Sequence, residues 1–163
     1  MMQRPEPHAQ DTARADALIA AWLRGEMPPA ERLPEDLLER VFYHGVCALL
    51  VARPQVMATL PLTLRDAIRQ QALGEAMRDL QHRRILAPLL EDLVREGIRV
   101  AVLKGTALAC SVYPSPALRP RGDTDLLADP AHVGMIHAIL KRHGFVRAEE
   151  GPIGPSATVA RQG

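Results

Sequence analysis

Aromatic side chains are scarce in this chain. They make up 3% of the 163 residues, so the interior must be built mainly from Leu, Val, Ile, Ala and Met. Cysteine is also rare, since Cys47 and Cys110 stand far apart and belong to no Cys-x-x-Cys pair or Cys/His cluster. This spacing argues against a disulfide scaffold and against a structural zinc site. We therefore expect a protein of a reducing compartment.

Neither sign of charge dominates, because the net charge is +1 at pH 7. Electrostatics alone therefore give no reason to expect broad adhesion to nucleic acids or membranes. No stretch approaches the ~18 consecutive apolar residues that a membrane span needs, and the polar residues 1–15 contain no apolar signal segment. The balance of 47% hydrophobic and 24% charged residues is that of a globular protein. We expect a cytoplasmic protein without membrane association.

Apolar residues recur every three or four positions through the first hundred residues, which predicts a helical region over 11–96. Its helices are expected at 11–25, 34–53 and 62–96. Pro88 lies inside the third, where a proline removes one main-chain hydrogen bond, so we expect a kink or break there. Gly97 is a suitable C-cap for this helix.

The pattern after Gly97 predicts a small αβ core over 97–148, because short β-branched runs now alternate with helical segments. Strands are expected at 98–103, at 123–128 and from Phe145, with helices at 106–112 and 131–143. Residues 149–163 are rich in Gly, Pro, Ser and Ala, and we expect a disordered tail. Because the alternation stops abruptly, we also expect this core to be incomplete.

Asp123 and Asp125 are the most informative pair of residues. Positions i and i+2 of a strand point to the same face, so the two carboxylates would emerge side by side. Adjacent anions repel each other unless a cation lies between them, and Mg²⁺ prefers such hard oxygen ligands. The alternative is that both are solvated loop acids, because Asp-x-Asp alone is a short motif.

Gly105 and Thr106 lie where a predicted strand meets a predicted helix. Such a corner offers free backbone N–H groups to an anion, and glycine lets a phosphate approach the main chain. Thr106 could cap the helix and also contact a phosphate oxygen. The alternative is an ordinary turn glycine followed by an ordinary N-cap. A phosphate corner beside a metal-binding acid pair would be suited to moving a nucleotidyl group.

Three segments in this order carry a family resemblance. Residues 102–109 read VLKGTALA, residues 113–120 read YPSPALRP, and residues 122–127 read GDTDLL. Together they resemble the signature of a poorly characterised nucleotidyltransferase family in the DNA polymerase β-like superfamily. The His-Gly-Phe run at 143–145 is similar to that family's continuation, so the resemblance covers about 97–145.

The resemblance implies an α+β protein, with a helical N-terminal region followed by a partial polymerase β-like core that contains a small mixed sheet. It also implies that the corner binds a triphosphate and that the acid pair, as the catalytic residues, binds Mg²⁺. The implied nucleotide-binding residues are Lys104, Gly105, Thr106 and Arg119, and the implied catalytic and metal-binding residues are Asp123 and Asp125. For Arg119 a salt bridge that pins the loop is an equal alternative. We expect Arg121 to be surface charge and the polar run 81–84 to be a solvated helix face.

The implied reaction is the metal-dependent transfer of a nucleoside monophosphate from an NTP to an acceptor hydroxyl. A protein, a small molecule or an RNA end could supply that hydroxyl. The superfamily uses a third carboxylate on a later strand, and here Glu149 and Glu150 lack the apolar neighbours that would place them on one. The chain is therefore an enzyme if a third carboxylate is supplied. The alternatives are a truncated, inactive fragment and a helical interaction module.

Overall fold

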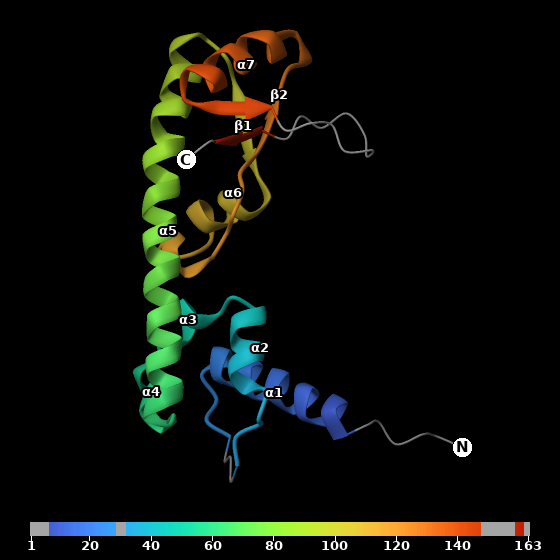
Figure 1. The fold of residues 1–163 in the computed structure, drawn as a ribbon, viewed down its shortest axis with the longest axis vertical. Coiled ribbons are helices and arrows are strands. Elements are labelled where there is room, and N and C mark those ends of the chain that lie inside the picture. The colour runs from blue at the N-terminus through green and yellow to red at the C-terminus, as the bar shows by residue number, and fades with distance from the viewer. Residues whose placement is uncertain (1–6, 29–31, 148–158, 162–163) are drawn as a thin grey trace, which may run out of the picture. The chain divides into compact units, whose positions relative to one another are not determined.

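The computed structural model describes residues 7–28, 32–147 and 159–161. These residues form two compact units, each described by itself below (Figure 1). Unit 1 consists of residues 1–79 and 109–122, and unit 2 consists of residues 80–108 and 123–163. Residues 80–96 of the expected helical region thus group with unit 2, and residues 109–122 group with the N-terminal helices.

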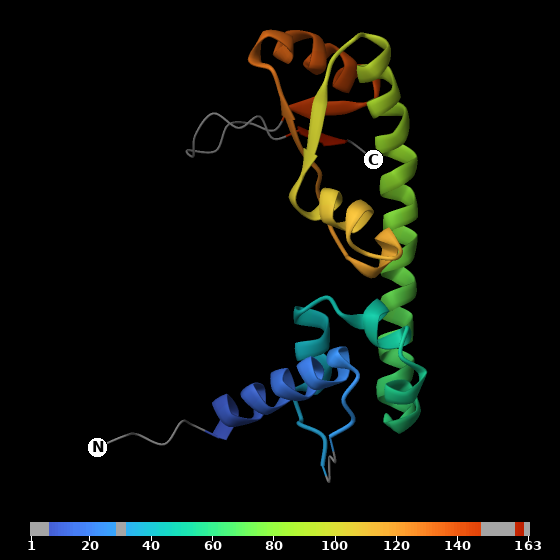
Figure 2. The same ribbon diagram turned by 180° about the vertical axis from the view of Figure 1, so that it is seen from behind.

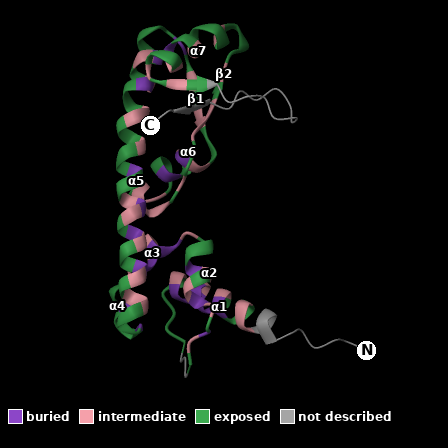
Figure 3. Cartoon of the chain, viewed as in Figure 1, coloured by how far each residue is buried: buried purple, intermediate pink, exposed green. Residues whose placement is uncertain are grey.

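Unit 1 is helical. Its elements are α1 (Pro7–Arg24), α2 (Leu37–Tyr43), α3 (Cys47–Val51), α4 (Pro54–Thr59), the first part of α5 (Leu62–Arg95), the end of α6 (Lys104–Ser111) and the 3₁₀ turn η1 (Pro116–Leu118). The core of this unit is aliphatic, with Trp22 as its one buried aromatic among the described residues. Leu37, Val41, Leu50 and Ile68 are almost completely buried in it. Figure 3 colours buried residues purple, among them part of α3. The core of unit 1 is thus built mainly from aliphatic side chains, as the composition predicted.

The second expected helix, over 34–53, is wrong as a single element. It forms two short helices, α2 and α3, separated at residues 44–46. Gly45 has a φ of +62°, a conformation that glycine adopts without steric cost. The Val46 N–H then bonds the Val41 carbonyl at 3.3 Å, which ends α2 in a C-terminal cap. The apolar period continues through the break, and for that reason the pattern alone predicted one helix.

The third expected helix is confirmed as α5, and it is not broken at Pro88 (Figure 2). Pro88 and Arg84, whose carbonyl loses its partner, are both exposed, so water can satisfy that carbonyl. Within unit 1, the stripe of Leu73 and Met77 is exposed at 64% and 65%. The buried side of this part of α5 comprises Ile68, Ala72, Glu75 and Asp79.

Unit 2 contains the αβ elements, and the α+β class is confirmed. They are the last part of α5, β1 (Val100–Leu103), the start of α6, β2 (Asp125–Ala128), the 3₁₀ turn η2 (Pro130–His132), α7 (Val133–Arg142), β3 (Phe145–Arg147) and β4 (Val159–Arg161). Gly97 ends α5 with a φ of +72°, so the predicted C-cap is confirmed. Leu89, Leu93, Ile98 and Ile139 form the buried core of this unit.

The strands pair in two antiparallel ladders, β1 with β2 and β3 with β4. A mixed sheet is therefore wrong for the described residues, because β3 bonds to β4 and not to the first pair. Strand β4 lies inside the segment expected to be a disordered tail, and that expectation is wrong for residues 159–161. Residues 159–161 read Val-Ala-Arg, a run too short to show an apolar alternation.

Two predictions fall on residues that the structure does not describe. Glu149 and Glu150 lie outside the described residues, as does most of the expected tail. Across 7–28, 32–147 and 159–161, none of the helices has both the length and the apolar character needed to cross a membrane.

Candidate nucleotide and metal site

The candidate site lies at one end of the β1–β2 ladder, in unit 2. The last pair of this ladder joins Leu103 to Asp125, and α6 begins at the next residue, Lys104. Lys104 has a φ of +49°, the left-handed conformation that side chains with a Cβ rarely adopt. This conformation costs on the order of 1 kcal/mol, and such strain is often found at functional positions. The predicted strand-to-helix corner is therefore present, with the unusual backbone at Lys104.

Asp125 forms an ion pair with Lys104 across this corner. The Lys104 Nζ lies 3.1 Å from the Asp125 Oδ1. The Lys104 side chain is 74% exposed and that of Asp125 is 35% exposed. Because both groups reach solvent, the pair is weak, within the range of about 0–1 kcal/mol measured for surface pairs. Asp125, which is predicted to bind a metal cation, thus already has the Lys104 ammonium beside it.

Thr106 ties the corner to the acidic segment through its hydroxyl. Its Oγ1 lies 3.1 Å from the Asp123 backbone carbonyl oxygen and 2.9 Å from the Thr124 Oγ1. Thr106 is 3% exposed, and both of these hydrogen bonds are partly buried. Buried polar groups of this kind are costly to leave unbonded. The corner and the acidic segment are consequently held together.

His82 extends this network from α5, with its Nε2 2.8 Å from the Thr124 Oγ1. A hydroxyl has one proton to donate. If Thr106 donates to the Asp123 carbonyl, Thr124 must donate to Thr106, and the His82 Nε2–H must donate to Thr124. Sequence reasoning missed His82, because residues 81–84 have the composition of a solvated face and the bonded threonine lies 42 residues away.

The two acids differ in their placement. Asp125 opens β2 and is half-buried, whereas Asp123 precedes the strand and is exposed. The strand thus begins two residues later than predicted, so the same-face argument for i and i+2 does not apply to the pair. Within the described part of the chain, no group of three or more His, Cys, Asp or Glu residues could hold a metal ion. A cation at the acid pair would therefore complete its ligand shell with water or with a bound molecule.

Arg119 belongs to unit 1, in the loop after η1. Its guanidinium carbon lies 5.8 Å from the centre of the Tyr113 ring, within cation–π range. Among the described residues it forms no salt bridge, which leaves the loop-pinning alternative without support there. The contact instead joins the Tyr-Pro and Arg-Pro parts of the segment that carries the family resemblance.

Arg121 is not surface charge, so that expectation is wrong. Its side chain is 4% exposed, and its Nη2 lies 2.7 Å from the Asp79 Oδ1, also within unit 1. A buried arginine needs a carboxylate partner, because an unpaired buried charge is very costly. Its partner, Asp79, is 42 positions away in sequence. Asp79 lies on the buried side of α5, where it and Glu75 interrupt the apolar period. The sequence offers no local signal for this pair.

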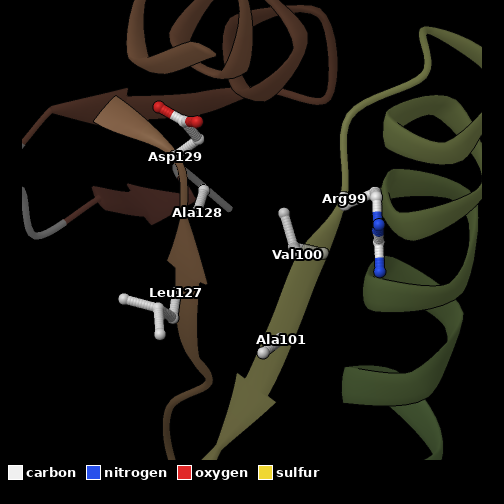
Figure 4. Close-up of a pocket in the computed structure, with 6 residues that line it drawn as sticks. All are labelled: Arg99, Val100, Ala101, Leu127, Ala128 and Asp129. Atoms are coloured by element: carbon white, nitrogen blue, oxygen red, sulfur yellow. The ribbon is translucent and has the colours of Figure 1, made fainter. Parts of the chain in front are cut away.

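A separate hollow of about 450 Å³ lies on the β1–β2 ladder. It is lined by Arg99, Val100, Ala101, Leu127, Ala128 and Asp129 (Figure 4). Val100 pairs with Ala128 at the end of the ladder opposite to Leu103 and Asp125. The hollow is mainly apolar, and the acid pair and the corner do not line it. We therefore do not place a nucleotide phosphate there.

A helical region followed by an αβ unit, with an acidic segment tied to a strand-to-helix corner, is the arrangement that the resemblance to a nucleotidyltransferase family implied. Comparison with family models agrees: residues 30–159 match the model described as uncharacterised nucleotidyltransferase. The match spans most of the chain, and the chain belongs to this family. Membership indicates a general role in nucleotidyl transfer. Searches of curated proteins and of solved structures gave no significant match.

Proposed function

We propose that this protein is a metal-dependent nucleotidyltransferase, which moves a nucleoside monophosphate from an NTP to an acceptor hydroxyl. The proposal rests on the two contacts that join the strand-to-helix corner to the acidic segment. The Thr106 hydroxyl bonds the Asp123 main chain at 3.1 Å, and Lys104 contacts Asp125 at 3.1 Å. The residues proposed to bind phosphate and the two acids thereby lie at one end of one ladder.

The residues present are suited to Mg²⁺. Two carboxylates are hard oxygen donors, and Mg²⁺ commonly uses one or two carboxylates together with substrate phosphates. The Lys104 ammonium beside Asp125 is a cation already held at this position. Asp123 and Asp125 would hold the metal, which when bound neutralises charge on the triphosphate.

The chain's own residues would bind and orient the nucleotide. Gly105 has no side chain to cover the main-chain N–H groups at the start of α6, where an anion is favoured. Lys104 supplies a positive charge with three donors for phosphate oxygens. Thr106 fixes the corner through its bond to the Asp123 carbonyl.

Calorimetric titration of each NTP, with and without Mg²⁺, tests this proposal. The unchanged chain is compared with the Asp123→Asn/Asp125→Asn double variant. The matched control is Glu39→Gln/Glu91→Gln, which also removes two negative charges, at exposed positions. We expect metal-dependent binding that the acid-pair variant loses and the control keeps. Equal binding by all three proteins would place the nucleotide elsewhere and overturn the proposal.

A further inference from the structure

The Lys104 ammonium lies beside Asp125, and the proposed function also assigns this lysine to the phosphates. Lys104 Nζ lies 3.1 Å from the Asp125 Oδ1, and this lysine adopts a left-handed backbone. A metal ion bound at Asp125 and an ammonium at hydrogen-bond distance from the same oxygen would repel each other. The two cations therefore compete for Asp125.

We propose that Lys104 exchanges partners during nucleotide binding: it neutralises Asp125 in the metal-free protein and moves to the triphosphate when a divalent cation takes its place. This inference rests on the proposed function and adds a coupling to it. Metal binding releases the lysine, and the released lysine then binds the anion that accompanies the metal. The two binding events become linked, and such linkage is reciprocal.

The exposure of the pair sets the size of the effect. A buried ion pair would block the metal strongly, but Lys104 is 74% exposed and its pair with Asp125 is correspondingly weak. Measured surface pairs correspond to about a two- to five-fold change in an equilibrium constant. The lysine therefore tunes metal affinity without closing the site.

The choice of lysine at this position is chemically specific. The chain has 20 basic residues, and only Lys104 and Lys141 among them are lysines. An arginine would form a bidentate pair with the carboxylate and hold it more firmly. Lysine is a compact point charge on a flexible stem with rotatable donors, which is suited to changing partners.

Metal titration of three full-length proteins tests the exchange. Mn²⁺ binding, without nucleotide, is measured by calorimetry for the unchanged chain, Lys104→Met and Lys141→Met. Lys141 is exposed and lies in the same unit, so its variant removes an equal charge away from the acids. We expect Lys104→Met to bind Mn²⁺ about two to five times more tightly, yet to bind the Mg²⁺ complex of an NTP more weakly. Unchanged or weaker Mn²⁺ binding by Lys104→Met would overturn the inference.

Amine acylation followed by mass spectrometry provides a second readout, with Lys141 as the internal standard. We expect Lys104 to become more reactive, relative to Lys141, when Mn²⁺ is added or when Asp125 is changed to Asn. Adding the Mg²⁺ complex of an NTP should protect it again. A Lys104 reactivity that Asp125→Asn and Mn²⁺ both leave unchanged would also overturn the exchange.

The two proposals fail in different ways. If the acid-pair variant loses metal-dependent NTP binding but Lys104→Met binds Mn²⁺ as the unchanged chain does, the exchange is wrong and the proposed function stands. If no metal-dependent NTP binding is found in any of the proteins, the proposed function fails, and the exchange fails with it.

Discussion

Replacing Thr106 with valine tests the bond that holds the corner to the acidic segment. Valine has nearly the same shape, so the change removes the hydroxyl and leaves the packing almost unaltered. Two hydrogen bonds are lost, to the Asp123 carbonyl at 3.1 Å and to the Thr124 hydroxyl at 2.9 Å. Each contributes about 0.5–1.5 kcal/mol net, which sums to about 1–3 kcal/mol.

Because Asp123 is exposed, the expected loss of stability is smaller than this sum. Water can reach the region of its carbonyl and replace part of the lost bond, whereas the Thr124 hydroxyl is only partly accessible. We therefore expect Thr106→Val to reduce the free energy of unfolding by about 1–2 kcal/mol. The matched control is Thr63→Val, at an exposed position, and we expect it to stay within about 0.5 kcal/mol.

Urea unfolding followed by far-ultraviolet circular dichroism measures both changes. A double-mutant cycle with Thr124→Val then isolates the contact between the two hydroxyls. If they bond each other, the double variant should lose less stability than the sum of the single losses, by about 0.5 kcal/mol or more. Equal stability of Thr106→Val and the unchanged chain, or strict additivity in the cycle, would refute this account of the corner.

Two further predictions concern carboxyl groups in unit 1. Burial raises the pKa of Glu75 above its usual value, although Gln71 donates a hydrogen bond to it. Ionising it therefore costs stability, and Glu75→Gln should stabilise the protein at pH 7, by a margin that shrinks as the pH falls toward about 4.5 and is absent well below it. Trp22 fluorescence in urea checks this, and a destabilised variant at pH 7 would contradict it. The hydrogen bond from Arg40, and next that from His44, lower the pKa of Asp16 from 3.8 to about 2. The resulting stability is present above pH 3.8 and is lost as the pH falls toward 2, so the deficit of Asp16→Asn should be largest near neutral pH and vanish near pH 2 in acid unfolding curves.

Features that depend on local chemistry were predictable from the sequence. Gly97 ends α5 with a positive φ, as its position after an apolar helical pattern indicated. Asp129 accepts a hydrogen bond from the Ala131 N–H at 2.8 Å, as expected of an acid before a helical turn that begins with proline. In both cases the cause lies within a few residues of the effect, so a single sequence window contains it.

Features that depend on distant partners were not predictable. Arg121 and His82 are of residue types that usually lie on the surface. Each instead bonds a partner 42 positions away, Asp79 and Thr124 respectively. Strand β4 is similar, because it consists of three residues and its partner strand β3 begins 14 positions earlier in the sequence. A polar residue that faces solvent and a polar residue that bonds a distant partner cannot be told apart in sequence, because both are charged or hydrogen-bonding residues within a polar stretch.

The chemistry of the corner explains why His82 and Thr124 were not predicted while Asp123, Asp125 and Lys104 were. The network from His82 through Thr124 to Thr106 is built of groups that share protons and leave the net charge of the two acids unchanged. A network of buried ion pairs could have fixed the same geometry, but it would have neutralised the carboxylates that a divalent cation needs. Hydroxyl groups therefore position the segment, and under the proposed function the charges of Asp123, Asp125 and Lys104 remain available to a ligand.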